Sequence, residues 1–282
     1  GGSIIGCYGP YKNVSPNPKC WVHPGSHGSL NVIGGIANSC NNFFYEVGYR
    51  LSTNNYLTKY NDSLGIDKIA EYAGLFGLDE TSGVEIVENK PQIADEYPVM
   101  AAIGQSNHNY TTVQLARYVT AIANGGTVYN YTLLDKICDS EGNVIETFSP
   151  DVRNTVDIMG ETEWNAIHSG MRMVVENSSA FAGFPIAVAG KTGTTSDSKD
   201  LYFCGYTPYY TAAVWVGYDK PKGLYGFTAG QRRTTASTYL WDTVMTAIHE
   251  DIIAAGNVKK FSDDLTKELV TRTFCKDSGL LM

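Results

Sequence analysis

Lys191-Thr192-Gly193-Thr194-Thr195 lies between two apolar runs, and these three segments together mark the centre of the predicted fold. The first run covers residues 184–189 and the second, strand-like run covers residues 201–207. Two apolar runs joined by a short polar link predict neighbouring antiparallel strands. The lysine then stands on a strand edge, where its charge can face a cleft and bind an anionic group.

A third strand and a set of helices extend from this centre in both directions. Strands are predicted at residues 184–194, 201–207 and 211–218, and the short link Pro208-Tyr209-Tyr210 makes the last two antiparallel neighbours. Helical periodicity and caps predict helices at residues 31–51, 62–74, 111–124, 161–175 and 235–255. A hairpin is predicted at residues 132–147, and the whole pattern indicates an α+β layered domain.

Ser39-Cys40-Asn41, inside the first predicted helix, is the second motif that carries chemistry. With Lys191-Thr192-Gly193 it supplies two of the three motifs of acyl-serine penicillin-recognising enzymes. Residues 27–45, 103–127 and 191–219 resemble class B penicillin-binding proteins of the elongation type, and the resemblance covers roughly residues 5–245. The tail at residues 275–280, with Asp200-Leu201-Tyr202-Phe203, resembles class A members instead.

This resemblance implies the β-lactamase/transpeptidase-like fold, with a central antiparallel five-stranded sheet between helical layers. Residues 1–282 are then the C-terminal portion of one transpeptidase domain, which includes a loop region at residues 4–40. The family's nucleophile is the serine of an S-x-x-K motif upstream of S-x-N, so we expect it before Gly1. Ser196-Asp197-Ser198-Lys199 matches S-x-x-K only by coincidence, and we interpret it as a solvated turn.

The resemblance also assigns a role to each motif residue. Ser39 relays a proton, Asn41 holds the substrate amide, and Lys191 attracts the terminal carboxylate of the substrate. The hydroxyls of Thr192 and Thr194 bind that carboxylate, while the Thr194 backbone N–H stabilises the oxyanion. Gly193 leaves room for a substrate that lies along the strand.

The implied activity is D,D-transpeptidation of D-Ala-D-Ala stem peptides of peptidoglycan through an acyl-serine, with β-lactams as substrate mimics. Expected partners are a cell-wall synthesis complex with a glycosyltransferase, at the outer face of the cell membrane. The alternatives are a non-catalytic β-lactam or peptidoglycan-binding module and a serine β-lactamase. A lost S-x-x-K serine favours the module, whereas the absence of an E-x-x-L-N pattern disfavours the β-lactamase.

Composition limits the other possibilities. The chain has 282 residues, of which 43% are hydrophobic and 18% charged, enough for one globular core. Its net charge of −8 without clustered Lys and Arg disfavours nucleic acid as a partner. No apolar run approaches the roughly 18 residues of a membrane helix, so we expect any membrane anchor in an upstream segment.

Three of the six cysteines fall within the first 40 residues. Together with two histidines they offer soft ligands for a structural, four-coordinate zinc ion. The preferred set is Cys7, Cys20, His27 and Cys40, with His23 as the alternative fourth ligand. A Cys7–Cys20 disulfide is the competing interpretation, with Cys40 as a small buried side chain. The remaining thiols, Cys138, Cys204 and Cys275, are taken as ordinary.

Overall fold

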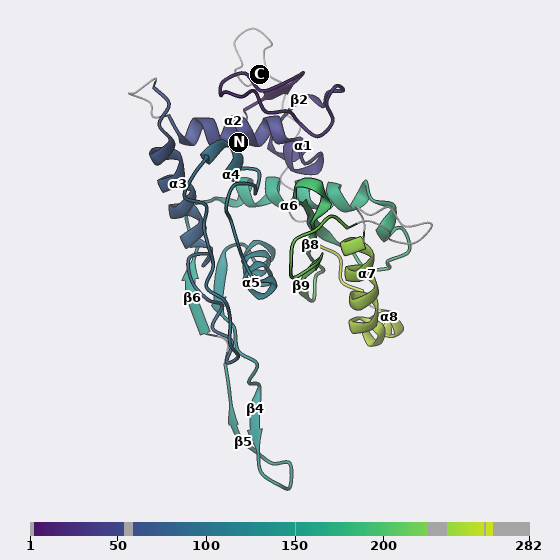
Figure 1. Ribbon diagram of the computed structural model, residues 1–282. Coiled ribbons are helices and arrows are strands. Elements are labelled where there is room, and N and C mark those ends of the chain that lie inside the picture. Colours follow the sequence, from purple (N-terminus) through teal and green to yellow (C-terminus); the bar gives the residue numbers. More distant parts are fainter. Residues whose placement is uncertain (1–2, 54–58, 150, 225–235, 257, 262–282) are drawn as a thin grey trace, which may run out of the picture.

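An antiparallel sheet of three strands, of which β8 and β9 are labelled beside α7 in Figure 1, carries the segment of residues 191–194. The computed structural model describes residues 3–53, 59–149, 151–224, 236–256 and 258–261. The strands are β7 (Ala189–Thr194), β8 (Asp200–Tyr206) and β9 (Thr211–Gly217), in the order β7-β8-β9. The three predicted strands are therefore confirmed, although β7 begins later than residue 184.

Within the described residues this sheet has three strands rather than five. The other strands pair away from it in two-stranded units: β1 (Ile5–Cys7) with β2 (Gly28–Leu30), β3 (Thr127–Asn130) with β6 (Asp151–Thr155), and β4 (Lys136–Cys138) with β5 (Val144–Thr147). The β4–β5 hairpin was predicted, and it forms a long arm that projects from the body of the molecule (Figure 1).

Helices cover both faces of the three-stranded sheet. α5 (Thr112–Ala123) and α6 (Glu161–Glu176) form a hydrophobic cluster with Ala189 and Tyr206, whereas α7 (Ala236–Ile248) packs Trp241 and Met245 against Phe203. Phe203 needs glycine neighbours, because a Cβ on Gly190 would lie 2.4 Å from its ring and one on Gly205 2.6 Å. The α+β class is confirmed, with the sheet between helical layers.

The predicted helix at residues 235–255 is wrong as a single element. It is divided into α7 and α8 (Glu250–Ala255), and His249 lies between them. The His249 side chain is fully buried, with Nε2 2.9 Å from the Thr207 hydroxyl and Nδ1 2.7 Å from the Met245 carbonyl. These bonds tie the helix junction to the end of β8, which a local helical pattern cannot reveal.

The predicted helix at residues 31–51 is also divided, into α1 (Val32–Ala37) and α2 (Asn41–Leu51). Asn31 caps α1 as predicted, with its side chain accepting from the Gly34 N–H at 3.0 Å. α1 ends in a Schellman motif, since Cys40 N–H donates to Gly35 and Ser39 N–H donates to Ile36. Ser39 occupies the left-handed position of this motif, with φ of 47°.

The remaining helices complete the body of the molecule. They are α3 (Asp62–Leu75), α4 (Pro98–Ala101) and the short turns η1 (Ser179–Phe181) and η2 (Ser196–Ser198). α5 begins as predicted at the Thr111 cap, where Gln114 closes a capping box. No helix of the described residues has the length and apolar character needed to cross a membrane.

Candidate active site and metal centre

Ser39 and Lys191 meet although 152 residues separate them in the chain. α1 packs on α6, and α6 packs on β7, so the end of α1 comes to lie beside the strand that carries Lys191. Gly170 makes this close packing possible, because a Cβ there would lie 2.8 Å from the Ile36 Cβ. The Lys191 Nζ donates to the Ser39 hydroxyl at 2.8 Å and to the Thr192 carbonyl at 3.0 Å.

The environment of Lys191 changes its acidity. Burial lowers the pKa of Lys191 from 10.5 to about 8, because an ammonium loses hydration in the protein interior. The group is thus still mainly charged near neutral pH, but it releases a proton much more readily than an exposed lysine. An ammonium hydrogen-bonded to a serine hydroxyl can hold an anionic group and exchange a proton through that hydroxyl.

The other predicted site residues lie around this contact. Asn41 is the half-buried first residue of α2, two positions after Ser39. Gly193 is opposite Tyr202 on β8 and shares the strand face of Lys191, while Thr192 and Thr194 lie on the other face. Thr194 is exposed, and β7 pairs only with β8 among the described residues. The outer edge of β7 can therefore accept an extended peptide.

A hydrogen-bonded turn follows β7. Thr195 and Asp200 bond to each other through backbone and side chains, and the Trp215 indole donates to the Asp200 carboxylate at 2.9 Å. The S-x-x-K sequence lies in this turn. Ser196 is exposed and donates to Gln105 at 3.5 Å, whereas the Lys199 Nζ lies 3.6 Å from Asp197. The interpretation of Ser196 as part of a solvated turn is consistent with these contacts.

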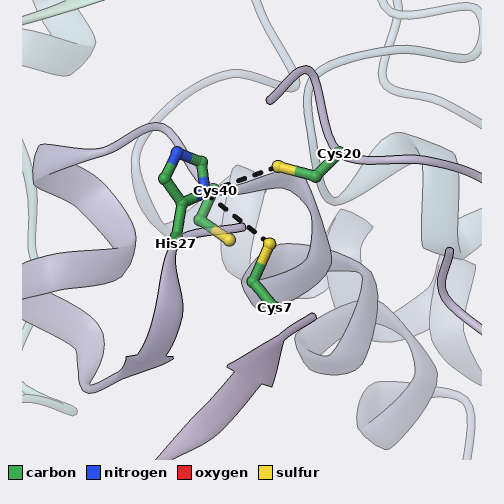
Figure 2. A group of neighbouring side chains, drawn as sticks. All are labelled: Cys7, Cys20, His27 and Cys40. Carbon is green, nitrogen blue, oxygen red and sulfur yellow. Dashed lines mark hydrogen bonds between the residues drawn. The ribbon is translucent and has the colours of Figure 1, made fainter. Parts of the chain in front are cut away.

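The side chains of Cys7, Cys20, His27 and Cys40 point toward one another (Figure 2), and Cys40 directly follows Ser39 in the chain. Their ligand atoms all lie within 4.8 Å of one another. His27 Nδ1 is 3.6 Å from the sulfur of Cys7 and 3.6 Å from that of Cys20. Zinc–sulfur and zinc–nitrogen bonds of about 2.3 and 2.0 Å at a tetrahedral angle would separate the sulfur and the nitrogen by about 3.5 Å.

The donor set therefore fits a tetrahedral metal ion. One imidazole nitrogen can form only one good hydrogen bond, so two equal contacts to thiols are better explained by atoms arranged around a common centre. Cys7, Cys20 and Cys40 are buried, and His27 is half-buried. These four residues could hold a metal, and four protein ligands would leave no open position for a reactive water.

Two alternatives from the sequence can be compared with this geometry. Cys7 and Cys20 are free thiols in the structure, so the disulfide is not formed. His23 is not part of the converging group, and its Nδ1 is buried without a hydrogen-bond partner among the described residues. Cys204 is half-buried on β8, Cys138 is exposed on the arm, and Cys275 lies outside the described residues.

Acidity differs among the clustered thiols. Burial raises the pKa of Cys40 to about 12. Burial also opposes ionisation of Cys20, but the backbone N–H groups of Val22, Asn42 and Asn41 lower its pKa overall. A thiol must lose its proton to bind a metal, so a bound cation would supply the charge that stabilises these thiolates.

Sequence reasoning missed Trp21. Its indole Nε1 donates to the carbonyl oxygens of Asn38 at 3.1 Å and Ser39 at 3.0 Å, and its ring centroid is 5.2 Å from that of His27. Trp21 directly follows the predicted ligand Cys20, but the backbone carbonyls that accept from its indole leave no signal in the sequence.

Together, this fold and the meeting of Ser39-Cys40-Asn41 with Lys191-Thr192-Gly193 at the Ser39–Lys191 contact match the penicillin-recognising class of proteins. The family model of the penicillin binding protein transpeptidase domain matches residues 10–235, and the chain belongs to this family. Penicillin-binding protein 1A of Clostridium acetobutylicum is 32% identical over 216 residues, which cover 73% of this chain and 24% of that protein. Penicillin-binding protein 1A of Clostridium perfringens strain 13 is 36% identical over 149 residues, which cover 50% of this chain and 20% of that protein.

Solved structures show the same fold. Penicillin-binding protein 2B of Streptococcus pneumoniae superposes with a TM-score of 0.69 at 20% identity, over 88% of this chain and 43% of that one. Penicillin-binding protein A of Mycobacterium tuberculosis, in its imipenem acyl-enzyme complex, superposes with a TM-score of 0.68 at 17% identity, over 87% of this chain and 55% of that one. The chain thus spans about a quarter or less of these curated relatives and about half of these solved chains.

Proposed function

We propose that this chain is the C-terminal portion of a serine D,D-transpeptidase domain. The observation that carries the proposal is the 2.8 Å contact between Lys191 and Ser39, which joins the two motifs of the family that the chain contains. The nucleophilic serine is expected on a preceding S-x-x-K segment. It attacks the carbonyl of the penultimate D-Ala, the terminal D-Ala leaves, and the amine of a neighbouring stem peptide then takes the acyl group.

Each motif residue has a distinct part in this reaction. Lys191 attracts the terminal carboxylate of the substrate, and Thr192 and Thr194 add hydroxyl donors at the strand edge. The edge of β7 that pairs with no strand of the described residues binds the stem peptide as an additional strand, next to Gly193. Ser39 exchanges a proton with the leaving or incoming amine, and Asn41 holds the substrate amide.

The wider setting follows from the same family membership. We infer that the whole protein works at the outer face of the cell membrane, within a cell-wall synthesis complex that includes a glycosyltransferase, and that β-lactams acylate it. One solved neighbour is a complex between penicillin-binding protein PBP2 and MreC from Helicobacter pylori. The assignment to the elongation-type class B subgroup stays a prediction.

The test is intact mass spectrometry of the protein expressed with its upstream coding sequence, before and after benzylpenicillin. We expect one penicilloyl adduct on a serine preceding Gly1, and a strongly reduced adduct yield in Lys191→Ala. Lys199→Ala is the matched control, because its ammonium pairs with Asp197 in the turn, and it should label normally. Absence of any adduct on the folded wild-type protein would favour a non-catalytic binding module.

We further propose that Cys7, Cys20, His27 and Cys40 bind a structural Zn²⁺ in the loop region of residues 4–40. The convergence of their ligand atoms within 4.8 Å supports this assignment. The ion would tie β1, β2 and the start of α2 together, and it would lie directly behind the S-x-N motif because Cys40 follows Ser39. Its part in the reaction would be indirect, through the shape of this motif.

Metal analysis distinguishes the predicted ligands. The purified protein should contain close to one zinc per chain, and Co²⁺ substitution should give the intense thiolate charge-transfer absorption of a Cys-rich site. His27→Ala should lower zinc content, whereas His23→Ala should retain it. Cys138→Ser is the thiol control on the exposed arm. Zinc content near zero in the folded wild-type protein would refute the site.

A further inference from the structure

Trp21 is a large side chain whose position is not explained by burial. It is 65% exposed, so it gains little from the hydrophobic effect in this place. Its polar atom is nevertheless bound: Nε1 lies 3.0 Å from the Ser39 carbonyl oxygen and 3.1 Å from that of Asn38. Both carbonyls lie just after α1, on its C-cap residue Asn38 and on the following Ser39.

The backbone of Ser39 needs support from its surroundings. Its φ of 47° is left-handed, a conformation that is unfavourable for any residue except glycine and persists only where neighbouring contacts hold it. The two Schellman hydrogen bonds fix the N–H groups of Ser39 and Cys40 on the carbonyls of Ile36 and Gly35. The Ser39 carbonyl shares its peptide group with the Cys40 N–H. The Trp21 indole donates to this carbonyl and so holds the same peptide group from its other end.

Trp21 is itself held by two residues of the converging Cys and His group, Cys20 and His27. It follows Cys20 in the chain, and its ring lies against His27 with centroids 5.2 Å apart. The side chain of Ser39 has a different partner, because its hydroxyl accepts a hydrogen bond from the Lys191 Nζ at 2.8 Å. Ser39 is therefore held between the indole on its carbonyl and the ammonium on its hydroxyl.

We propose that Trp21 is a positioning residue of the active site. Its indole N–H holds the carbonyl of Ser39 and so sets the direction in which the Ser39 hydroxyl meets Lys191. Trp21 acts through Ser39 in this role and not on the substrate. The expected effect on catalysis rests on the proposed transpeptidase function, whereas the hydrogen bond itself does not.

The first experiment removes the indole N–H and keeps the ring. Site-specific 3-benzothienylalanine at position 21 replaces N–H by sulfur, and Trp21→Phe is the simpler variant. In the protein with its upstream segment, both should slow acylation by benzylpenicillin about fivefold, the rate equivalent of one backbone hydrogen bond of about 1 kcal/mol. The half-saturating concentration and the melting temperature should change little.

The matched control is Tyr8→Phe. It removes one side-chain hydrogen bond in the same loop region, between the hydroxyls of Tyr8 and Ser29 at 2.8 Å, and this bond does not involve the Ser39 carbonyl. Acylation by this variant should equal that of the wild type. A fivefold loss in Tyr8→Phe as well, or no loss with benzothienylalanine, would overturn the positioning role.

The second experiment needs no nucleophile and uses the 282-residue chain. Hydrogen exchange of the Trp21 indole, assigned in the ¹⁵N spectrum by its loss in Trp21→Phe, should be about tenfold slower than in free tryptophan despite the exposed ring. If the wild-type protein fails to acylate while exchange is slow, the proposed function fails and the hydrogen bond stands. Exchange at the rate of free tryptophan would overturn the inference whatever the acylation result.

Discussion

Replacement of Lys191 by methionine should change how the stability of this protein depends on pH. Burial lowers the pKa of Lys191 from 10.5 to about 8 in the folded protein. Between these two pH values the unfolded chain binds more protons than the folded chain, so the free energy of unfolding rises with pH across this window. At 1.36 kcal/mol per pH unit, the rise contributed by Lys191 is about 3 kcal/mol.

The assay is urea unfolding of the wild type and Lys191→Met at pH 7 and pH 10, by linear extrapolation. Other groups titrate alike in both proteins, so the difference between their unfolding free energies isolates the lysine. That difference should shift by about 2 to 3 kcal/mol in favour of the wild type between pH 7 and pH 10, because the unfolded lysine has titrated only in part at pH 10. Carbon-13 methyl labels on the lysines should show directly one amine that titrates near pH 8 and disappears in Lys191→Met.

Lys199→Met is the matched control. Its side chain is 41% exposed and pairs with Asp197, so burial gives it no comparable desolvation cost. This variant should follow the wild type at both pH values. If the stability difference between wild type and Lys191→Met is the same at pH 7 and pH 10, the ammonium is not desolvated. The reasoning about the Ser39–Lys191 contact would then be refuted.

Three further predictions test the sheet, the turn and the metal loop. Gly190→Ala places a Cβ 2.4 Å from the Phe203 ring and should cost about 2–3 kcal/mol in urea unfolding, whereas Gly9→Ala, with nothing within 4 Å, should be nearly neutral. Trp215→Phe removes the donor to the Asp200 carboxylate and should cost about 2 kcal/mol by the same measurement. Since the proposed zinc site would stabilise the folded loop, addition of a strong chelator should lower the melting temperature of the wild type by several degrees, and much less in Cys20→Ser, as calorimetry can measure.

The parts of the fold that could be predicted are those with local signals. The strands β8 and β9 were found because the short link at residues 208–210 leaves no room for another connection. The Thr111 cap and the glycines at 125 and 126 marked α5 at both ends. The cysteine and histidine spacing likewise predicted the converging cluster, because ligand type restricts the choice before any geometry is known.

The parts that were wrong depend on contacts between distant residues. The division at His249 comes from its bond to Thr207, 42 residues away. Trp21 was missed because the acceptors of its indole are backbone carbonyls, which every residue carries and no sequence pattern marks.

The division at Ser39 has a different cause. The apolar periodicity of residues 31–51 continues through the break, and the left-handed position of the Schellman motif holds a serine where glycine is usual. A glycine would relieve the backbone strain and would have marked the end of α1 in the sequence, but it would leave Lys191 without its hydroxyl partner. Both residues of this contact therefore lower the stability of the folded protein, because Lys191 is a buried cation and Ser39 has a strained backbone. Residues that break local rules together, at one point of the fold, indicate selection for chemistry rather than for folding.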